Sequence, residues 1–277
     1  MVSEFISGNR DYAIPCLHNI NGREKTICVI VHGFGSSKGS PTATMLLSEL
    51  PSTGIGAIAF DLPAHGESGV DGGYLRLQNC LSDLAAVEEQ ARALAPESEI
   101  VYFASSFGAY ITLIYFAEKK QKKCRAFLRS AAVNMPQLLI QRLTPEQKVC
   151  LETVGEFTIN KAEYGYIRDL KLTKGFFDDL AAHDVFNLWR VGLADLQMVH
   201  GEVDQTVPLG DVRAFAEMFL VPMLVIPNGD HQLSIPGAPE QVLKIAIEFY
   251  KEGCKYEKRH WSKSAVISYA GSGSCNL

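Results

Sequence analysis

Residues 100–110 of this chain, IVYFASSFGAY, predict a buried strand that turns sharply into a helix. The β-branched and aromatic run at 100–103 stops at small residues, and a helix-like run at 109–116 begins directly afterwards. A serine at the apex of such a turn presents its hydroxyl group above the end of a sheet, where it can act as a nucleophile. For this stretch alone, the alternative is a buried strand-to-helix junction without chemistry.

Ser106 is the candidate nucleophile of this turn. The pattern G-x-S-x-G places small residues two positions before and after the serine, because strand and helix approach each other there. Ala104 and Gly108 fill those positions around Ser106, whereas Ser105 would have phenylalanines on both sides. Alanine departs from the first glycine of the pattern, so the assignment depends on partners elsewhere in the chain.

An acid and a base follow downstream. Asp204 lies just after the strand-like run at 196–200, and His231 follows the strand-like run at 222–227. A free serine hydroxyl is a weak nucleophile near neutral pH, and a histidine held by a carboxylate can remove its proton. We therefore expect Ser106, Asp204 and His231 to form a catalytic triad.

Two other acidic residues compete with Asp204 for the role of the acid. Glu202 lies in the same turn but two residues earlier, and Asp230 adjoins His231 and is expected to point away from it. Asp204 is the preferred interpretation, with both alternatives open.

Two further motifs lie upstream, VIVHGFG at 29–35 and FDLPAHGES at 60–68. Together with the turn at Ser106 and the chain order Ser, Asp, His, they resemble the α/β-hydrolase superfamily, whose triad order differs from those of other triad folds. The resemblance covers residues 10–250 and implies a hydrolase, while saying little about the substrate.

The resemblance also suggests roles for residues in the two upstream loops. In the superfamily the amide after H-G and the amide after the nucleophile bind the oxyanion, which implies the backbone N–H groups of Phe34 and Phe107. Asp61 or His65 could instead be a metal ligand or a triad member, but a hydrogen-bonded scaffold loop is preferred because better acids and bases follow. His32 is interpreted as a brace of its loop.

The predicted fold class is α/β, an α/β-hydrolase fold. We expect a mostly parallel, doubly wound sheet of about eight strands with helices on both faces and a small helical cap. The predicted core comprises residues 1–134 and 190–253, and 135–189 hold a helical cap or lid insertion plus a crossover helix. Further expected strands are a hairpin within 3–20 and runs at 26–31, 56–60 and 125–133.

Two segments remain outside this core. A tail at 254–277 has a strand-like centre at 265–269 that could pair with a sheet edge or a second subunit, which leaves a homodimer open. The cap region carries four candidate substrate-binding aromatics, and packing of the cap on the core is their alternative role. They are Tyr164, Tyr166, Phe176 and Phe177.

The cysteine content, the net charge and the lack of targeting segments indicate which partners and which cellular compartment to expect. The seven cysteines are scattered without a C-x-x-C pair, which is typical of reduced thiols and predicts neither disulfide framework nor zinc site. The net charge of −5 and the lack of a long basic run argue against nucleic acid. Without a signal peptide or membrane-spanning stretch, we expect a cytoplasmic protein with no cofactor, no metal and no membrane partner.

The expected reaction is hydrolysis of small-molecule carboxylic esters with small to medium apolar or aromatic groups, through an acyl-enzyme. An aminopeptidase or amide hydrolase on the same triad is one alternative, distinguished by a cap carboxylate that would bind a substrate amine. A non-catalytic ligand receptor on the same fold is another, because fold does not determine function.

Overall fold

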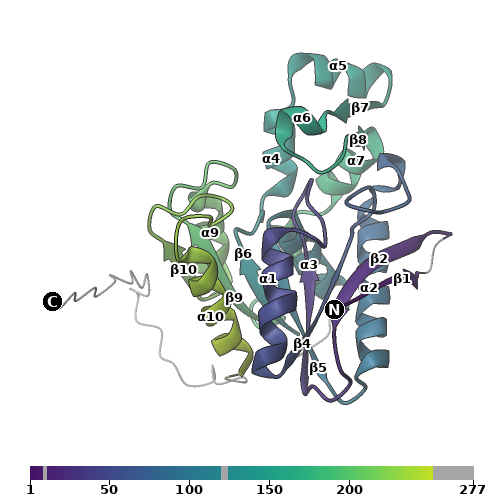
Figure 1. Ribbon diagram of the computed structural model, residues 1–277. Helices are drawn as coiled ribbons and strands as arrows, with labels where there is room; N and C mark the ends of the chain where they lie inside the picture. The colour runs from purple at the N-terminus through teal and green to yellow at the C-terminus, as the bar shows by residue number, and fades with distance from the viewer. Residues whose placement is uncertain (9–10, 120–123, 252–277) are drawn as a thin grey trace.

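The computed structural model describes residues 1–8, 11–119 and 124–251, so the predicted tail at 254–277 lies outside it. An eight-stranded sheet has the order β1-β2-β4-β3-β5-β6-β9-β10 (Figure 1). The β1–β2 and β2–β4 pairs are antiparallel, and the five pairs from β4 to β10 are parallel. The predicted mostly parallel, eight-stranded sheet is therefore confirmed. Its strands are β1 (Val2–Ser7), β2 (Ala13–Asn19), β3 (Thr26–Val31), β4 (Ile55–Phe60), β5 (Glu99–Ser105), β6 (Arg125–Arg129), β9 (Asp195–Gly201) and β10 (Met223–Ile226).

The central strands are apolar on both faces, as strands of a parallel sheet are when helices cover both sides. In β3, Ile27, Val29 and Val31 pack into one hydrophobic cluster, while Cys28 and Ile30 pack into the other. Successive side chains of a strand point to opposite faces, so a continuous apolar run serves two cores.

Helices cover both faces of the sheet (Figure 1). Buried residues of α2 (Leu77–Leu94), α3 (Phe107–Lys119) and α9 (Leu209–Met218) share one cluster with the sheet. Those of α1 (Pro41–Glu49) and α10 (Ala238–Lys251) share the other. Short 3-10 turns η1 (Leu50–Thr53) and η2 (Gly72–Tyr74) follow α1 and precede α2. None of the described helices is long and apolar enough to cross a membrane.

A long excursion between β6 and β9 forms the segment at one end of the sheet in Figure 1. Where the sequence predicted only short helical pieces, the structure also has a two-stranded antiparallel sheet, β7–β8. Its strands are four residues long, and alternation over so few residues gives little signal in a sequence. The elements are α4 (Met135–Arg142), α5 (Pro145–Thr153), β7 (Glu156–Ile159), α6 (Lys161–Tyr164), β8 (Leu170–Thr173), α7 (Lys174–Ala182) and α8 (Val185–Leu188).

A bidentate ion pair ties α7 to the start of α2. Arg76 donates through Nε and Nη2 to the two carboxylate oxygens of Asp179, each at 2.7 Å, and the Leu77 amide donates to the same carboxylate at 3.0 Å. Arg168 also donates to the carbonyl of Ser68 at 2.7 Å. These hydrogen bonds hold the excursion against the start of α2 and the loop at Ser68.

The sixth strand is shorter than the sequence suggested. We predicted it over 125–133, but β6 ends at Arg129, because Ser130 has a positive φ of 49° and leaves the extended conformation. The Ser130 hydroxyl donates to the carbonyl of His231 at 2.8 Å. The early end of β6 therefore brings its loop against the loop that carries the candidate base.

Candidate active site

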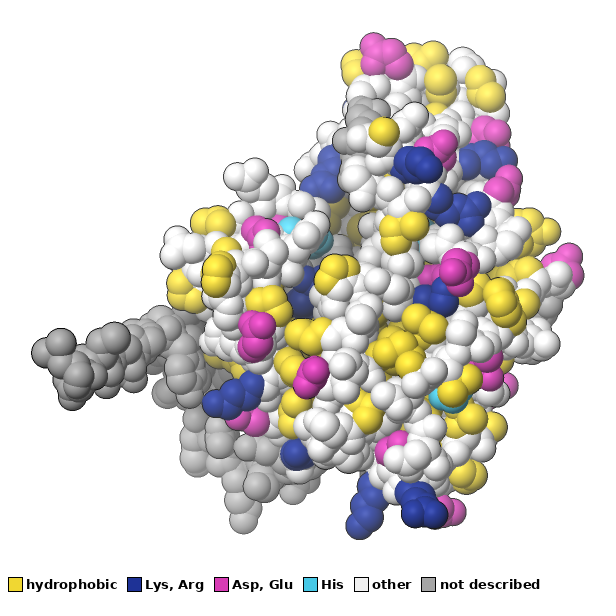
Figure 2. All heavy atoms as spheres, in the orientation of Figure 1, with side chains coloured by type: hydrophobic (Ala, Val, Ile, Leu, Met, Phe, Trp, Pro, Cys, Tyr) yellow, Lys and Arg dark blue, Asp and Glu magenta, His cyan; other side chains and the backbone are white. Residues whose placement is uncertain are grey.

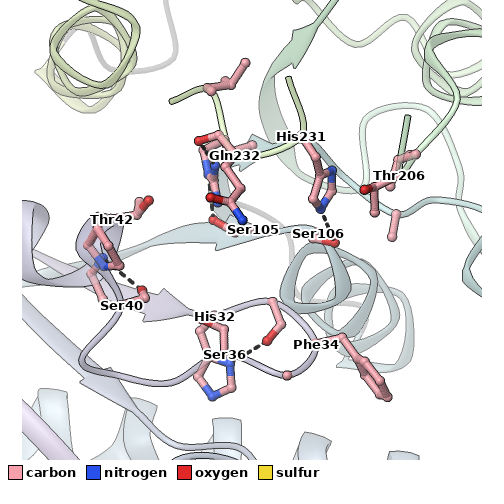
Figure 3. Close-up of a pocket in the computed structure, with 18 of the residues that line it drawn as sticks. His32, Phe34, Ser36, Ser40, Thr42, Ser105, Ser106, Thr206, His231 and Gln232 are labelled. Carbon is pink, nitrogen blue, oxygen red and sulfur yellow. Dashed lines mark hydrogen bonds between the residues drawn. The ribbon is translucent and has the colours of Figure 1, made fainter. Parts of the chain in front are cut away.

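Ser106 occupies the apex between β5 and α3, in a left-handed conformation with φ of 51°. Such a φ is uncommon outside glycine and persists only where the surroundings enforce it. The Ser106 amide donates to the carbonyl of Arg129 at 3.0 Å, and its own carbonyl accepts from the Ala109 amide at 3.0 Å. The end of β6 and the first turn of α3 thus hold Ser106 at the carboxyl end of the central strand β5, where it lines a cavity (Figure 3).

The surroundings of Gly108 explain why a small residue must lie two positions after Ser106. A Cβ atom at Gly108 would lie 2.4 Å from the carbonyl oxygen of Val31 and 2.5 Å from that of His32. The first turn of α3 therefore packs directly against the end of β3. Ala104, on the other side of the apex, is completely buried.

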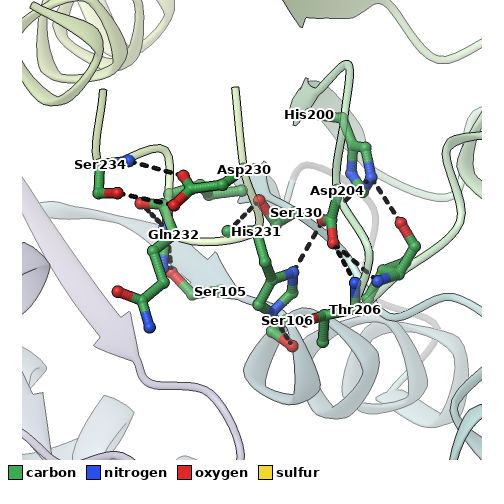
Figure 4. Close-up of polar contacts among 12 residues, drawn as sticks. Ser105, Ser106, Ser130, His200, Asp204, Thr206, Asp230, His231, Gln232 and Ser234 are labelled. Atoms are coloured by element: carbon green, nitrogen blue, oxygen red, sulfur yellow. Dashed lines mark hydrogen bonds and ion pairs between the residues drawn. The ribbon is translucent and has the colours of Figure 1, made fainter. Parts of the chain in front are cut away.

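Ser106, His231 and Asp204 lie in a hydrogen-bonded chain (Figure 4). The distance from Ser106 Oγ to His231 Nε2 is 3.1 Å, and the distance from His231 Nδ1 to Asp204 Oδ2 is 2.8 Å. A carboxylate only accepts, so Nδ1 carries the proton and Nε2 is left to accept from the serine hydroxyl. The chain brings together three residues that the sequence separated by up to 125 positions.

Asp204 is anchored by its own loop. Its Oδ1 accepts from the amides of Thr206 and Val207 at 2.7 and 2.8 Å. Burial raises the pKa of Asp204, but the hydrogen bond and charge of His231 and the Val207 amide outweigh burial, and the net pKa is lowered. Asp204 is therefore ionised and fixed in orientation, as a residue that orients a histidine must be.

His200, which the sequence analysis did not single out, also touches this carboxylate. Its Nε2 lies 3.2 Å from Asp204 Oδ2 and 3.0 Å from the carbonyl of Val207. Both neighbours are acceptors, so Nε2 carries the proton, and burial lowers the pKa of His200. His200 could have been found from the sequence, because it lies at the end of the predicted strand and four residues before Asp204.

The two rival acids bond elsewhere. Glu202 accepts from the Asn228 amide at 3.0 Å, and Asp230 accepts from the amide and hydroxyl of Ser234 at 2.8 and 2.7 Å. Asp230 stabilises a turn of its own loop, whereas Glu202 links the loop after β9 to the loop after β10. Of the three carboxylates, Asp204 is therefore the one that faces His231.

The loop after β3 lies directly against Ser106. A Cβ atom at Gly33 would be 3.3 Å from the Cβ and 3.9 Å from the Oγ of Ser106, so the residue that precedes Phe34 packs on the serine. Among the described residues, neither the Phe34 nor the Phe107 amide has a hydrogen-bond acceptor. Two free N–H groups beside a serine are the arrangement that stabilises an oxyanion.

His32 and the loop at Asp61 support this segment from behind. His32 Nε2 accepts from the Leu62 amide at 3.1 Å, and Nδ1 donates to the carbonyl of Gly33 at 2.8 Å. The carboxylate of Asp61 accepts from the amide and the Nζ of Lys38, at 2.7 and 2.8 Å. These bonds place both residues in the scaffold of the loops.

A cavity of about 870 Å³ opens above Ser106 and His231 and runs beneath the excursion. One of its walls is apolar and comes largely from α4, through Met135, Leu138 and Leu139. Among the described residues, no group of three or more His, Cys, Asp or Glu side chains is arranged to hold a metal ion.

The four predicted substrate-binding aromatics take different places. Tyr166 lines the cavity, with its ring 5.9 Å from that of Phe34. Phe176 and Phe177 are buried in α7, and the Phe176 ring stacks against Phe34 from outside the cavity lining. Tyr164 belongs to α6, and its side chain lies outside the described part of the structure.

Comparison with known proteins identifies the family and the fold of the chain. A sequence model of the family described as serine aminopeptidase, S33, matches residues 22–174, more than half of the chain. No curated protein sequence matches.

Several solved structures share the fold. A putative hydrolase from Agrobacterium vitis is 21% identical, with a TM-score of 0.74 over 90% of this chain and 97% of that one. Est1E from Butyrivibrio proteoclasticus, with ferulic acid bound, is 18% identical, with a TM-score of 0.73 over 89% and 99% of the two chains. An esterase from Pyrococcus furiosus is 19% identical, with a TM-score of 0.63 over 90% and 91%.

The matched residues include both upstream loops and the turn at Ser106, and the solved neighbours share the fold over about nine tenths of this chain. The chain is therefore a hydrolase that belongs to the serine aminopeptidase S33 family of α/β hydrolases.

Proposed function

We propose that this hydrolase cleaves carboxylic esters with small to medium apolar or aromatic groups, using Ser106, His231 and Asp204. The observation that carries the proposal is the continuous chain of hydrogen bonds, 3.1 and 2.8 Å long, from the serine hydroxyl to a buried carboxylate. Such a chain turns a weak nucleophile into an effective one.

In the proposed reaction, Ser106 Oγ attacks the ester carbonyl carbon while His231 Nε2 takes the hydroxyl proton. The imidazolium that forms is stabilised by Asp204, and the amides of Phe34 and Phe107 bind the developing oxyanion. The tetrahedral intermediate collapses to an acyl-enzyme as His231 gives its proton to the leaving alcohol. Water, deprotonated by His231, then attacks the acyl-enzyme, and His231 returns the proton to Ser106 Oγ as the acyl–oxygen bond breaks and the acid leaves.

The charges of the cavity favour esters over peptides with a free amino terminus. A site for such a peptide would need a carboxylate to bind the substrate ammonium group. Among the described residues that line the cavity, two are arginine and none is aspartate or glutamate. Amide hydrolysis remains the second candidate because the family description names an aminopeptidase.

The apolar wall supports the proposed acyl and alcohol groups. Met135, Leu138, Leu139 and Tyr166 form a surface on which an alkyl or aromatic group can be buried. The ferulic acid bound to Est1E makes aromatic acid esters a reasonable part of a substrate panel.

The test is a panel of neutral 4-nitrophenyl and methyl esters run beside matched anilides. We expect ester turnover that Ser106→Ala abolishes, and a fluorophosphonate probe should label the wild type and Ser105→Ala but not Ser106→Ala. Faster anilide cleavage would favour the amide alternative, and absence of turnover despite labelling would favour a receptor. Labelling that survives Ser106→Ala would contradict the nucleophile assignment.

A further inference from the structure

The described lining of the cavity is positively charged beside the nucleophile. Arg129 and Arg142 line it, without an aspartate or glutamate among the lining residues that the structure describes. A cavity with cationic side chains and no acidic ones attracts anions and disfavours cations.

Arg129 is held in a fixed position next to Ser106. It ends β6 opposite Ser105, and its Nε donates to the Ser105 hydroxyl at 3.1 Å. Its Nη1 donates to the carbonyl of Gln232 at 2.6 Å. These bonds use two of the five N–H groups of a guanidinium, so three remain for a ligand.

The charge of Arg129 has no direct counter-ion. Over the described parts of the chain, no carboxylate lies within ion-pair distance of its guanidinium. Burial lowers the pKa of Arg129 to about 10, against the opposing effect of the charges of Asp230 and Asp204. A partly buried charge without a partner is costly for a folded protein, and a ligand that supplies the partner offsets that cost.

The helix α1 adds to the positive potential at the same end of the cavity. Its N-terminal residues, from Ser40 to Ala43, line the cavity, and its first turn has no acidic residue. Figure 3 shows Ser105 and Gln232 on the side of Ser106 that faces Ser40 and Thr42, opposite Phe34 and Thr206. The N-terminus of a helix carries a partial positive charge that favours anions.

We propose that this end of the cavity binds a carboxylate on the ester substrate, with Arg129 as the residue that recognises it. The inference rests on the proposed esterase function and narrows its substrates to esters that carry a free acid group. The apolar wall of α4 then accommodates the uncharged part of the molecule, with the scissile bond above Ser106 between the two.

Arg142 is the weaker candidate for this role. It ends α4 with an exposed side chain, whose Nη2 donates to the carbonyl of Thr206 at 2.7 Å. Ion pairs at exposed positions contribute little because water and salt screen them. Arg129 is the more rigidly held of the two and the more deeply placed.

The test compares esters that differ only in a terminal carboxylate or carboxamide, which have the same size. One series carries this group on the acyl chain and the other on the alcohol, so the two arms tell which side of the ester faces Arg129. In at least one series, wild-type kcat/KM should favour the carboxylate by roughly tenfold or more, as expected for a charge-assisted hydrogen bond. A ratio near one in both series would overturn the proposal.

Variants assign the preference to a residue. Arg129→Gln should bring the carboxylate-to-carboxamide ratio close to one, mainly through KM, and Arg129→Lys should retain part of it. Displacement of the His231 loop by the lost Gln232 contact would slow both esters alike and leave the ratio unchanged. Arg190→Gln removes one positive charge from an exposed arginine outside the cavity lining, and should preserve the ratio. A ratio that survives Arg129→Gln, or that falls only in Arg142→Gln, would contradict the assignment.

A binding measurement separates this inference from the proposed function. Calorimetry on Ser106→Ala protein should show tighter binding of the carboxylate ester than of the carboxamide, and Ser106→Ala/Arg129→Gln should lose the difference. If the wild type turned over no ester, the esterase proposal would fail. The difference in affinity between the carboxylate and the carboxamide ester would still test the carboxylate site. Equal affinities beside normal turnover of neutral esters would reject the carboxylate site alone.

Discussion

Asp204 receives three hydrogen bonds that hold its carboxylate against His231, two from its own loop and one from the imidazole itself. Replacing a carboxylate of this kind with an amide leaves the shape nearly unchanged but no longer enforces the tautomer with the proton on Nδ1. Replacing Asp204 with asparagine therefore tests what the negative charge of this side chain contributes to catalysis, with little change in its shape.

We expect Asp204→Asn to lower kcat by about four orders of magnitude while the protein remains folded. Glu202→Gln and Asp230→Asn serve as matched controls and should change kcat little, because the carboxylates bond to Asn228 and Ser234 and not to His231, and the new amides keep an accepting oxygen. Steady-state kinetics, with thermal unfolding as the folding check, measures all three. A larger loss in Glu202→Gln than in Asp204→Asn would show that the wrong acid was assigned.

Gly108 is a second residue at which the structure makes a sharp prediction. In Gly108→Ala the new Cβ would meet backbone oxygen atoms that cannot move aside, and the free energy of unfolding should fall by about 3 kcal/mol. Gly210→Ala is the control, since nothing lies within 4 Å of its Cβ position in α9, and it should stabilise the protein by up to about 1 kcal/mol. Chemical denaturation of both variants measures the difference, and equal stabilities would mean that α3 does not pack on β3 as described.

At the scale of elements, α4 and the loop carrying Tyr166 form the variable wall of the cavity. Each additional methylene buried there contributes about 0.8 kcal/mol, which corresponds to a several-fold rise in kcat/KM. Turnover of neutral esters should therefore climb with chain length and then level off once the cavity is filled. A profile flat across chain lengths would place the apolar group elsewhere.

Tyr166→Ala should shift that chain-length optimum, because its ring lines the cavity. Phe177→Ala is a matched aromatic truncation in α7, outside the lining; it should keep the optimum and lose about 3–5 kcal/mol of stability. Kinetics over an ester series, beside denaturation curves, checks both. A shift in Phe177→Ala without a shift in Tyr166→Ala would reverse these roles.

At the scale of the whole molecule, Glu88 joins the face of α2 to β5 and α3. Its carboxylate accepts from the hydroxyls of Tyr102 and Tyr115, each at 2.6 Å, and from Arg92 and Lys119. Burial raises the pKa of Glu88, but these hydrogen bonds outweigh burial and lower it from 4.5 to about 2. The ionised form is therefore the one that the folded state stabilises.

This lowered pKa predicts how stability depends on pH. The contribution of Glu88 is complete above pH 4.5 and is lost as the pH falls from there toward 2, because the unfolded chain takes up the proton first. Glu88→Gln should lower the free energy of unfolding at neutral pH by on the order of 2 kcal/mol and flatten its fall in this window. Urea denaturation at a series of pH values measures both, and an unchanged slope in the variant would assign the acid sensitivity to other carboxylates.

The sequence by itself determined the fold class, the candidate nucleophile and the order of the candidate acid and base. These features are local: an apolar run that ends at small residues marks a buried strand and its turn, and the spacing around Ser106 admits few side chains. The central parallel strands such as β3 and β4 could be predicted for the same reason, since strands buried on both faces are continuous apolar runs.

Contacts between distant segments were decided only by the tertiary structure. The hydrogen bond from His231 shows that Asp204 is the acid that faces it. The lining of the cavity separates Tyr166, which is part of it, from Phe176, which is buried behind it. In the sequence, an aromatic residue that lines a cavity looks the same as one that packs in the core. Helical periodicity indicates that a face is buried, but not whether it faces a cavity or other side chains. Arg129 read as part of a strand in the sequence, and its position beside Ser106 became visible only once β6 was paired with β5.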